Sequence, residues 1–394
     1  MKQKTTITTL SALALVATGG LLVAGPLNPP AGPVTGTYKT LSEVEPRIAI
    51  NAMNTPGDAD SVFRITQPGS YYLTGNVTGV ANRRGIEIAA NNVTLDLNGF
   101  TLQGVPSSLD GIASDLSGLT AITIRNGTIR DWAGDGIDLN ANRVVGGQIA
   151  HIVAVGNAIT GVRAGDAFVI DSCSLVSNTS DGLSVGVGAT VKSVIARLNG
   201  NNGIRALERA ILADCTASNN VGSGFSLTNA SAITNSSSDS NGGNGIAAGF
   251  LNTISGCTVA RNSLGGIITN GSNIIRDNTV SENTNTGIQV AFQSIVRGNT
   301  VTLNTGAGIF VTSLRSRIEG NHCMSNATGI QVTGTANLII GNSCASNSSR
   351  NYDIATGNRY GPIINITAAG ASAALGNSAT STLLSTDPHA NFAH

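Results

Sequence analysis

The stretch from Asn283 to Val311 reads NTNTGIQVAFQSIVRGNTVTLNTGAGIFV and contains one short pattern twice. Each copy has an Asn, three variable residues, a Gly and an Ile, and the second copy begins 21 residues after the first. After each Gly the first and third residues are apolar and the second varies, as in a strand with one buried face. A unit this short has no room for a helix with its own core, so the pattern predicts one turn of a β-solenoid per repeat.

The repeat extends over most of the chain. The Gly recurs at steps of 21 residues, after three wider steps of 26, 25 and 25 residues. An Asn stands four residues before most of these glycines and resumes after a one-residue slip. The markers are Gly85, Gly111, Gly136, Gly161, Gly182, Gly203, Gly224, Gly245, Gly266, Gly287, Gly308 and Gly329, and the Asn column is Asn157, Asn178, Asn199, Asn220, Asn241, Asn262, Asn283, Asn304, Asn326 and Asn347.

We therefore expect an all-β chain that forms a single-stranded right-handed parallel β-helix over residues 81–367. With 21 residues per coil it would have about 12 coils. The Asn side chains should stack in neighbouring coils and hydrogen-bond along the column, as amides do in cross-β ladders.

The ends of the chain differ from the repeat. Residues 1–25 resemble a signal peptide, with Lys2 and Lys4 before an apolar run and a cleavage site near Ala24–Gly25. A membrane anchor is the alternative, although the apolar run is short and broken. Pro26 stands where a lipoprotein signal requires Cys, so we expect no lipid anchor.

Residues 26–80 are predicted to be a linker and an N-terminal cap of helix and strands. Thr40 to Met53 has the pattern of a short amphipathic helix, and Val62 to Val77 that of strands. Residues 368–394 are predicted to be a low-complexity C-terminal tail. Such caps would cover the apolar end coils of a solenoid.

Composition restricts the partners. The chain of 394 residues has a formal net charge of zero and only 11% charged residues, so it lacks the basic stripe that follows a nucleic acid. No later stretch is long enough to span a bilayer. We expect a secreted, periplasmic or cell-surface protein whose partner is extracellular polysaccharide; the sequence leaves its oligomeric state open.

The five cysteines follow the repeat. Cys173, Cys215 and Cys257 share one inward column at two-coil spacing, which is beyond disulfide reach. Cys323 and Cys344 are one coil apart, so they are either a disulfide or stacked buried thiols, and we favour the thiols. None of the four histidines has a metal-ligand neighbour at usable spacing, so we expect no metal and no cofactor.

These Asn-x-x-x-Gly-Ile units, together with the segment Asn92 to Phe100 (NVTLDLNGF), resemble the right-handed parallel β-helix proteins of the pectate-lyase-like superfamily. The resemblance covers residues 40 to 365 and implies the fold. It does not select a function, because the superfamily includes lyases, hydrolases, epimerases, adhesins and tailspikes.

The catalytic motifs of the superfamily are mostly missing. None of the polygalacturonase motifs Asn-Thr-Asp, Asp-Asp and Gly-His-Gly is found, and the calcium-binding acidic clusters and arginine base of pectate lyases have no clear match. Asp387-Pro388-His389 matches three letters of a mannuronan epimerase motif, but Ala390 stands in place of the acid. Whether the chain is an enzyme is therefore open, and its catalytic residues are unknown.

A candidate carbohydrate site lies on the outward column two residues past each marker Gly. In a chain with little charge, all the charges of this column fall in its first half, and two Asp residues precede marker glycines beside it. Extra residues at Val105–Leu109 and Asn140–Gln148 would wall a groove there. A plain surface ion pair between Asp138 and Arg163, about 5 Å apart in neighbouring coils, is the competing interpretation. The candidates are Glu87, Asp110, Asp135, Asp138, Arg163 and Arg205.

The hypothesis that we favour is a secreted or cell-surface β-helix protein that binds carbohydrate through an outward sheet face and has no evident catalytic motif. The first alternative is a polysaccharide lyase or glycoside hydrolase that uses two carboxylates. The second is a structural or adhesive surface rod. Ice binding through outward hydroxyl rows is a minor alternative, because Thr is an ordinary residue on an exposed strand.

Overall fold

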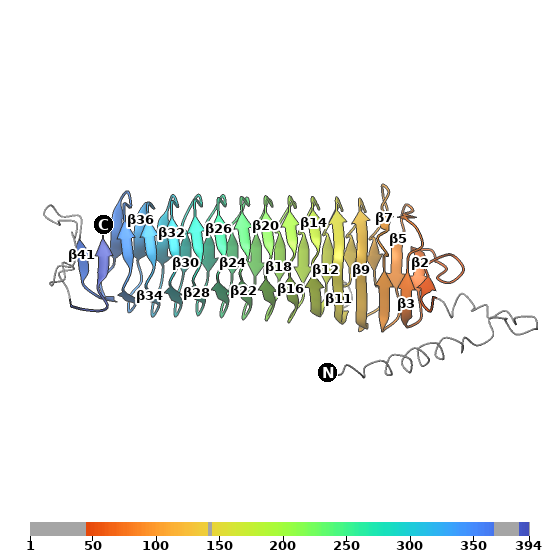
Figure 1. The fold of residues 1–394 in the computed structure, drawn as a ribbon, viewed down its shortest axis with the longest axis horizontal. Helices are drawn as coiled ribbons and strands as arrows, with labels where there is room; N and C mark the ends of the chain where they lie inside the picture. The colour runs from red at the N-terminus through yellow and green to blue at the C-terminus, as the bar shows by residue number, and fades with distance from the viewer. Residues whose placement is uncertain (1–44, 141–143, 366–385, 394) are drawn as a thin grey trace, which may run out of the picture. The chain divides into compact units, whose positions relative to one another are not determined.

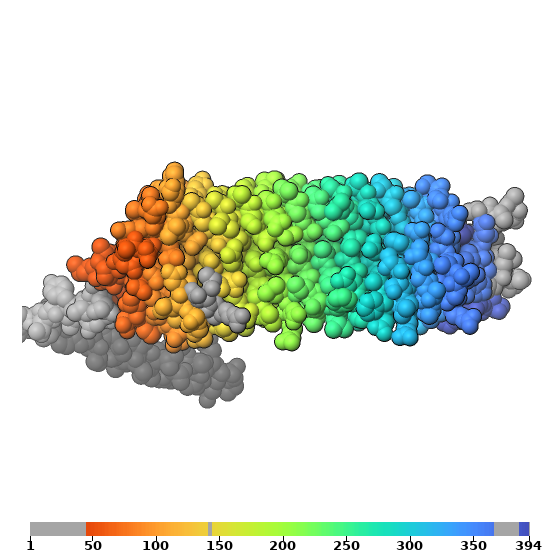
Figure 2. Space-filling model, turned by 180° about the vertical axis from the view of Figure 1, so that it is seen from behind, coloured from red at the N-terminus to blue at the C-terminus, as the bar shows by residue number. Residues whose placement is uncertain are grey.

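The structure, a computed structural model, describes residues 45–140, 144–365 and 386–393. Residues 47 to 394 form one compact unit. Its described residues wind as a right-handed parallel β-helix in which successive coils follow one another in sequence order (Figures 1 and 2). The predicted fold class is confirmed, and the described part of the chain contains no helix.

Each regular coil contributes three short strands, which stack into three faces. Face 1 is a sheet of 14 parallel strands and holds the strand that follows each marker Gly. Its strands are β2 (Ser61–Ile65), β5 (Arg84–Ile88), β8 (Ile112–Ala113), β10 (Ile137–Asp138), β12 (Val162–Ala164), β15 (Leu183–Val185), β18 (Ile204–Ala206), β21 (Phe225–Leu227), β24 (Ile246–Ala248), β27 (Ile267–Thr269), β30 (Ile288–Val290), β33 (Ala307–Val311), β36 (Thr328–Val332) and β39 (Arg350–Ile354).

Faces 2 and 3 join into one sheet of 28 strands, because the long strands β9 (Thr120–Arg130) and β11 (Val145–Val155) run through both. Face 2 further comprises β1 (Ile48–Ala49), β3 (Gly69–Tyr72), β6 (Val93–Asp96), β13 (Asp166–Asp171), β16 (Thr190–Lys192), β19 (Ile211–Ala213), β22 (Ala232–Thr234), β25 (Thr253–Ser255), β28 (Ile274–Arg276), β31 (Ile295–Arg297), β34 (Arg317–Glu319), β37 (Leu338–Ile340) and β40 (Arg359–Tyr360). Face 3 comprises β4 (Val77–Thr78), β7 (Thr101–Gln103), β14 (Ser174–Val176), β17 (Ile195–Arg197), β20 (Thr216–Ser218), β23 (Ser237–Asp239), β26 (Thr258–Ala260), β29 (Thr279–Ser281), β32 (Thr300–Thr302), β35 (His322–Met324), β38 (Ser343–Ala345), β41 (Ile363–Asn365) and β42 (Asn391–Ala393).

The predicted Asn ladder is present at the corner between faces 3 and 1. The Asn199 side-chain amide donates to Asn220 Oδ1 at 2.9 Å, and Asn220 donates to Asn241 Oδ1 at the same distance. Each side-chain oxygen also accepts the backbone N–H of the Asn one coil earlier, as Asn220 Oδ1 does from Asn199 N at 3.0 Å. The ladder therefore satisfies buried backbone groups that a corner would otherwise leave unpaired.

Two further ladders were not predicted. One lies between faces 1 and 2 and the other between faces 2 and 3, and both occur only in later coils. The first contains Ser231, Asn252, Asn273, Ser294, Ser316, Asn337 and Asn358. The second contains Asn278, Asn299, Asn321, Asn342 and Asn391.

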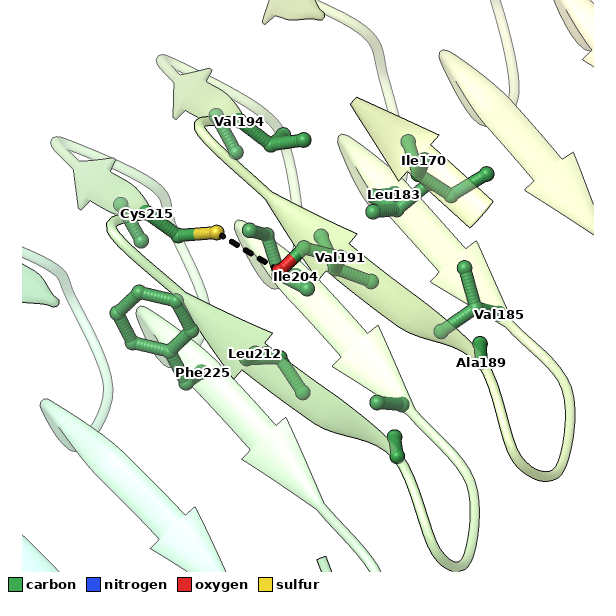
Figure 3. Close-up of a cluster of buried hydrophobic side chains, with 14 of the residues drawn as sticks. Ile170, Leu183, Val185, Ala189, Val191, Val194, Ile204, Leu212, Cys215 and Phe225 are labelled. Atoms are coloured by element: carbon green, nitrogen blue, oxygen red, sulfur yellow. Dashed lines mark hydrogen bonds between the residues drawn. The ribbon is translucent and has the colours of Figure 1, made fainter. Parts of the chain in front are cut away.

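The core between the three faces is filled by aliphatic columns such as Ile170, Val191 and Leu212, all fully buried (Figure 3). The Cys215 thiol lies among them and donates to the Val191 carbonyl at 3.7 Å. All five cysteines are buried and free. Cys323 and Cys344 are register partners in β35 and β38, so the stacked thiols that we favoured are the arrangement found. Burial raises the pKa of Cys215 to about 11, which keeps this thiol protonated and unreactive.

The N-terminal coils correct two expectations. In the part of Thr40–Met53 that the structure describes, the expected helix is absent, and β1 pairs in parallel with β3. The strand is set by this pairing, in which Ile48 is the register partner of Tyr71 and Ala49 that of Tyr72. The coils also begin at β2, so there are about fifteen turns rather than about twelve. The coil of β2 was missed because it has no marker Gly: Phe63 is the register partner of Ile86, but Val62 precedes it where Gly85 precedes Ile86. The signal peptide prediction lies outside the described residues.

At the other end, part of the predicted tail returns to the solenoid. Strand β42 lies between β38 and β41 and pairs in parallel with both. The order in the sheet is therefore β38, β42, β41, which differs from the order in the sequence. Asn391 is fully buried and accepts the side-chain amide of Asn342 at 3.2 Å. The Tyr352 hydroxyl donates to the Phe392 carbonyl at 2.9 Å. The C-terminal residues thus complete both a face and a ladder.

Candidate functional site

The predicted outward column of face 1 is aligned as the repeat required. Asp138 and Arg163 are register partners in β10 and β12, and Glu87 lies two coils from Asp138 through Ala113. Arg205 in β18 follows Arg163 after Ser184. The structure adds Arg64 of β2 at the start of the column, beside Glu87. Sequence reasoning missed Arg64 because the coil that holds it was assigned to the cap.

Glu87 lies beneath Arg64 rather than on an open surface. Arg64 Nε is 3.2 Å from Glu87 Oε2, and Arg64 Nη1 is 3.2 Å from the Asp58 carboxylate. The Glu87 side chain is 4% exposed, and this burial raises its pKa despite the cation beside it. Arg64 remains 35% exposed. A ligand on this part of face 1 would therefore meet the guanidinium first.

Asp110 and Asp135 hold the turns that precede face 1. Asp110 Oδ1 accepts the backbone N–H of Asp135 at 2.8 Å, and Asp135 Oδ1 accepts that of Thr160 at 2.6 Å. In later coils the same position carries Asp181 and amides, such as Asn202, which accepts from Ser223 N at 3.1 Å. The two carboxylates therefore have a structural role that an Asn also performs in this fold.

The same two carboxylates meet Asp138 and two arginines at the edge of face 1. Arg163 Nη1 is 3.5 Å from Asp135 Oδ2 and 3.8 Å from Asp138 Oδ2. Arg84 Nη1 is 2.8 Å from Asp115 Oδ2, and its Nε is 3.9 Å from Asp110. Arg84 and Asp115 were not predicted, because they lie outside the outward column.

Burial controls the protonation of this cluster. It raises the pKa of Asp135 to about 6, and it also raises that of Asp110, because in both the loss of solvent outweighs the backbone hydrogen bond and the nearby arginine. Asp135 and Asp138 are only 2% and 8% exposed. The Arg163 side chain is 33% exposed. The cluster therefore presents an anchored guanidinium to solvent and keeps the carboxylates of Asp135 and Asp138 buried behind it.

Arg205 differs from Arg163. It is exposed, and it makes no ion pair with another residue in the described ranges. Two coils separate the two side chains, which places them about 10 Å apart along the axis. Arg205 is thus a second cation on the same row, without a carboxylate to hold it.

The long segments that were expected to wall a groove are placed only in part. Ser108 of the first segment accepts the backbone N–H of Ala133 at 3.3 Å, so this turn packs on the next coil. Of the second segment, residues 141–143 lie outside the described ranges, and β11 takes up the chain from Val145.

Asp387-Pro388-His389 forms the turn that leads into β42. Asp387 Oδ1 accepts the backbone N–H of His389 at 2.8 Å, and Ala390 is buried where the epimerase motif has an acid. In the described ranges no group of three or more His, Cys, Asp or Glu residues is arranged to hold a metal ion. Those ranges also contain no helix of the length and apolarity needed to cross a membrane.

Comparison with known proteins agrees with the fold. Residues 210–377 match the family model described as the right handed beta helix region. No curated protein sequence matches the chain. Similar solved structures include the A-module of the Azotobacter vinelandii mannuronan C-5 epimerase AlgE4, with 14% identity over 74% of this chain and 88% of that chain and a TM-score of 0.49.

Two other similar structures are an alginate epimerase and a tailspike protein. The periplasmic alginate epimerase AlgG is 13% identical over 82% of each chain, with a TM-score of 0.41. The Dettilon tailspike protein is 18% identical over 76% of this chain and 62% of that chain, with a TM-score of 0.41. At such identities and TM-scores, nothing about the activity of these proteins transfers to this chain.

The fold, the ladders and the family match together define the class: this is a right-handed parallel β-helix protein. The right-handed parallel β-helix fold that the sequence resemblance implied is confirmed.

Proposed function

We propose that the protein is exported and binds extracellular polysaccharide along the first half of face 1, without cleaving it. The observation that carries the proposal is the Arg163 guanidinium, which two buried carboxylates hold in place while a third of its side chain faces solvent. Because its side chain is already ordered, a guanidinium fixed in this way loses little further conformational entropy when it donates hydrogen bonds to sugar oxygens. Arg205 supplies a second donor on the same row.

A glycosidase reaction is the second candidate, and one observation supports it. A carboxyl with a pKa of about 6, as in Asp135, is suited to general acid catalysis near neutral pH. However, the Asp135 side chain is 3% exposed, and its Oδ1 already accepts the Thr160 N–H. It does not reach a ligand lying on face 1, so the geometry favours binding over cleavage.

A glycan array combined with a reducing-sugar assay tests the proposal. We expect the wild-type protein to bind at least one polysaccharide on the array and to release no reducing ends from it. Arg205→Ala should weaken that binding by about tenfold, equal to about 1.4 kcal/mol, and should leave the melting temperature unchanged because Arg205 is exposed and makes no ion pair with a described residue. A silent array would favour the structural rod, and release of reducing ends would favour the enzyme.

A further inference from the structure

An exposed aromatic pair stands outside the charged site. Phe250 and Phe292 are 40% and 36% exposed, and their ring centroids lie 6.1 Å apart with the ring planes inclined at 40°. They belong to the turns that follow β24 and β30, two coils apart. Aromatic residues make up only 4% of the chain, so two neighbouring exposed rings are unusual for this surface.

The pair exists because the coil between them carries a Gly at the equivalent position. Turns two coils apart would lie about 10 Å from each other. A Cβ on Gly271 would stand 2.6 Å from the Phe292 ring, so that ring occupies the space above the Gly271 backbone. Backbone bonds from Leu251 N to Gly271 O, at 3.3 Å, and from Ser272 N to Phe292 O, at 2.7 Å, hold the three turns together. The rings therefore sit on a rigid base.

The three turns that carry and separate the rings are uncharged, and the exposed Arg315 stands in the turn of the following coil, beside Gln293. The turns 249–252, 270–273 and 291–294 contain no acidic or basic residue. The outward column of face 1 beside them is also neutral, with Ile268, Gln289, Phe310 and Gln331. Leu251, 64% exposed, extends the apolar surface. The apolar rings and these neutral turns favour an uncharged ligand over an ionic one.

A neutral sugar ring fits these features. The C–H groups on one face of a pyranose pack on an aromatic ring, while hydroxyls at its edge bond to side-chain amides and hydroxyls such as those of Gln293 and Ser272. A protein partner fits poorly, because a few exposed side chains present far less than the ~800 Å² that each side of a stable protein interface buries.

We infer that Phe250 and Phe292 form a stacking subsite for a neutral pyranose of a polysaccharide chain. The ligand class rests on the proposed function, but the residues are different from those of the charged site. The subsite lies beside the same face, further along the axis from Arg205, so one extended glycan running along the rod would contact both.

Phe292→Trp in the full-length protein gives a direct test. The only native Trp, Trp132, is 1% exposed, so wild-type fluorescence should not respond to a surface ligand. We expect titration with cellohexaose, mannohexaose or xylohexaose to shift the emission of the variant to shorter wavelength and to saturate. Adding Phe250→Ala should weaken this response at least about tenfold. The matched control is Ile211→Trp, which places an exposed Trp on face 2 and should give no response.

The outcomes separate the two proposals. A silent Phe292→Trp variant, titrated with a glycan that the wild type binds, would overturn the stacking subsite and leave the charged site standing. A saturating response that survives Arg163→Ala with Arg205→Ala would support the subsite even if the charged site failed. An equal response from Ile211→Trp would show unspecific contact and overturn the inference.

Discussion

The coils before Ser231 and the coils after it fill the same corners with different chemistry. In the earlier coils the corner between faces 2 and 3 holds Cys173, Val194 and Cys215, and in the later coils it holds an amide ladder that includes Asn278 and Asn299. The corner between faces 1 and 2 changes in the same way, from Phe168, Ala189 and Ala210 to Asn252 and Asn273. Only the corner between faces 3 and 1 has an Asn ladder in both regions, from Asn157 onward, with Trp132 at the same position one coil earlier.

The outward row of face 1 differs between the same two regions. In the earlier coils it carries Glu87, Asp138, Arg163 and Arg205, and in the later coils it is neutral as far as Gln331, with Asp353 following in the last strand. Neighbouring coils stay in register in both, so a corner can be filled either by apolar volume or by amides that satisfy the backbone. The later half thus has amide ladders at its corners and a more regular repeat, while the earlier half holds the buried charged side chains.

The largest effect should come from breaking a ladder in the later half. Asn299→Ala removes an amide that donates to Asn321 Oδ1 at 2.9 Å and to the carbonyls of Ile275 and Arg297 at 3.1 Å. With several buried groups left unpaired, we expect a loss of about 3–5 kcal/mol in unfolding free energy. Cys215→Ala, at the same corner of the earlier half, leaves only a small cavity and should cost about 1–2 kcal/mol. Denaturant unfolding of both variants measures the difference, and equal losses would contradict this account of the corners.

The next effect is a pH dependence that belongs to the earlier half. The pKa of Asp135 is about 6 in the folded protein, above its unfolded value, so the unfolded chain ionises first as the pH rises. Stability should therefore fall between about pH 4 and pH 6, by at most about 3 kcal/mol, and then level off. Burial raises the pKa of Asp110 and Glu87 too, which adds to the fall in the same direction.

Asp135→Asn isolates this contribution. The variant keeps an acceptor for the Thr160 N–H, as Asn202 does for Ser223, but it cannot ionise. Melting temperatures of wild type and variant, measured from pH 4 to pH 7, should diverge as the pH rises, with the variant the more stable at pH 7. Parallel profiles would show that Asp135 does not titrate with a raised pKa.

A smaller effect is expected at the C-terminal end of the later half. Asn391→Ala removes the last ladder member, which accepts the backbone N–H of Asn342 at 3.0 Å. We expect a loss of about 2 kcal/mol, because one end of the ladder is left open while the coils before it stay paired. Proteolysis of the tail should then become faster, and Phe392→Ala serves as the comparison. Unchanged protection of the tail in Asn391→Ala would mean that this hydrogen bond does not hold β42 in place.

The Asn ladder between faces 3 and 1 was predictable because its members recur at one spacing beside a marker Gly. The two other ladders could not be predicted in this way, because their columns contain more than one residue type. Ser294 and Ser316 interrupt the Asn residues of one ladder, and Cys257 stands at the start of the other. The coil of β2 escaped prediction because Val62 replaces the marker Gly there. The return of Asn391 depends on tertiary pairing that a local pattern does not contain.

For the site, alternation along the strand was sufficient to align Asp138 with Arg163. It was not sufficient to show that the carboxylates are covered, because their burial depends on long arginine side chains such as Arg64 and on turns of neighbouring coils. The turn role of Asp110 and Asp135 would have been visible in the sequence as a column shared with Asp181 and Asn202.

The most direct test of the central claim is a calorimetric titration of two double variants with a polysaccharide that the wild type binds. The first variant, Asp138→Ala with Arg163→Ala, removes one acidic and one basic side chain from face 1. The second, Arg276→Ala with Asp277→Ala, is the matched control and removes the exposed ion pair at the end of β28 on face 2. We predict that the first variant loses binding while keeping most of its melting temperature, and that the second binds like the wild type. Unchanged binding in the first variant, or an equal loss in both, would contradict the claim that the charged half of face 1 holds the polysaccharide.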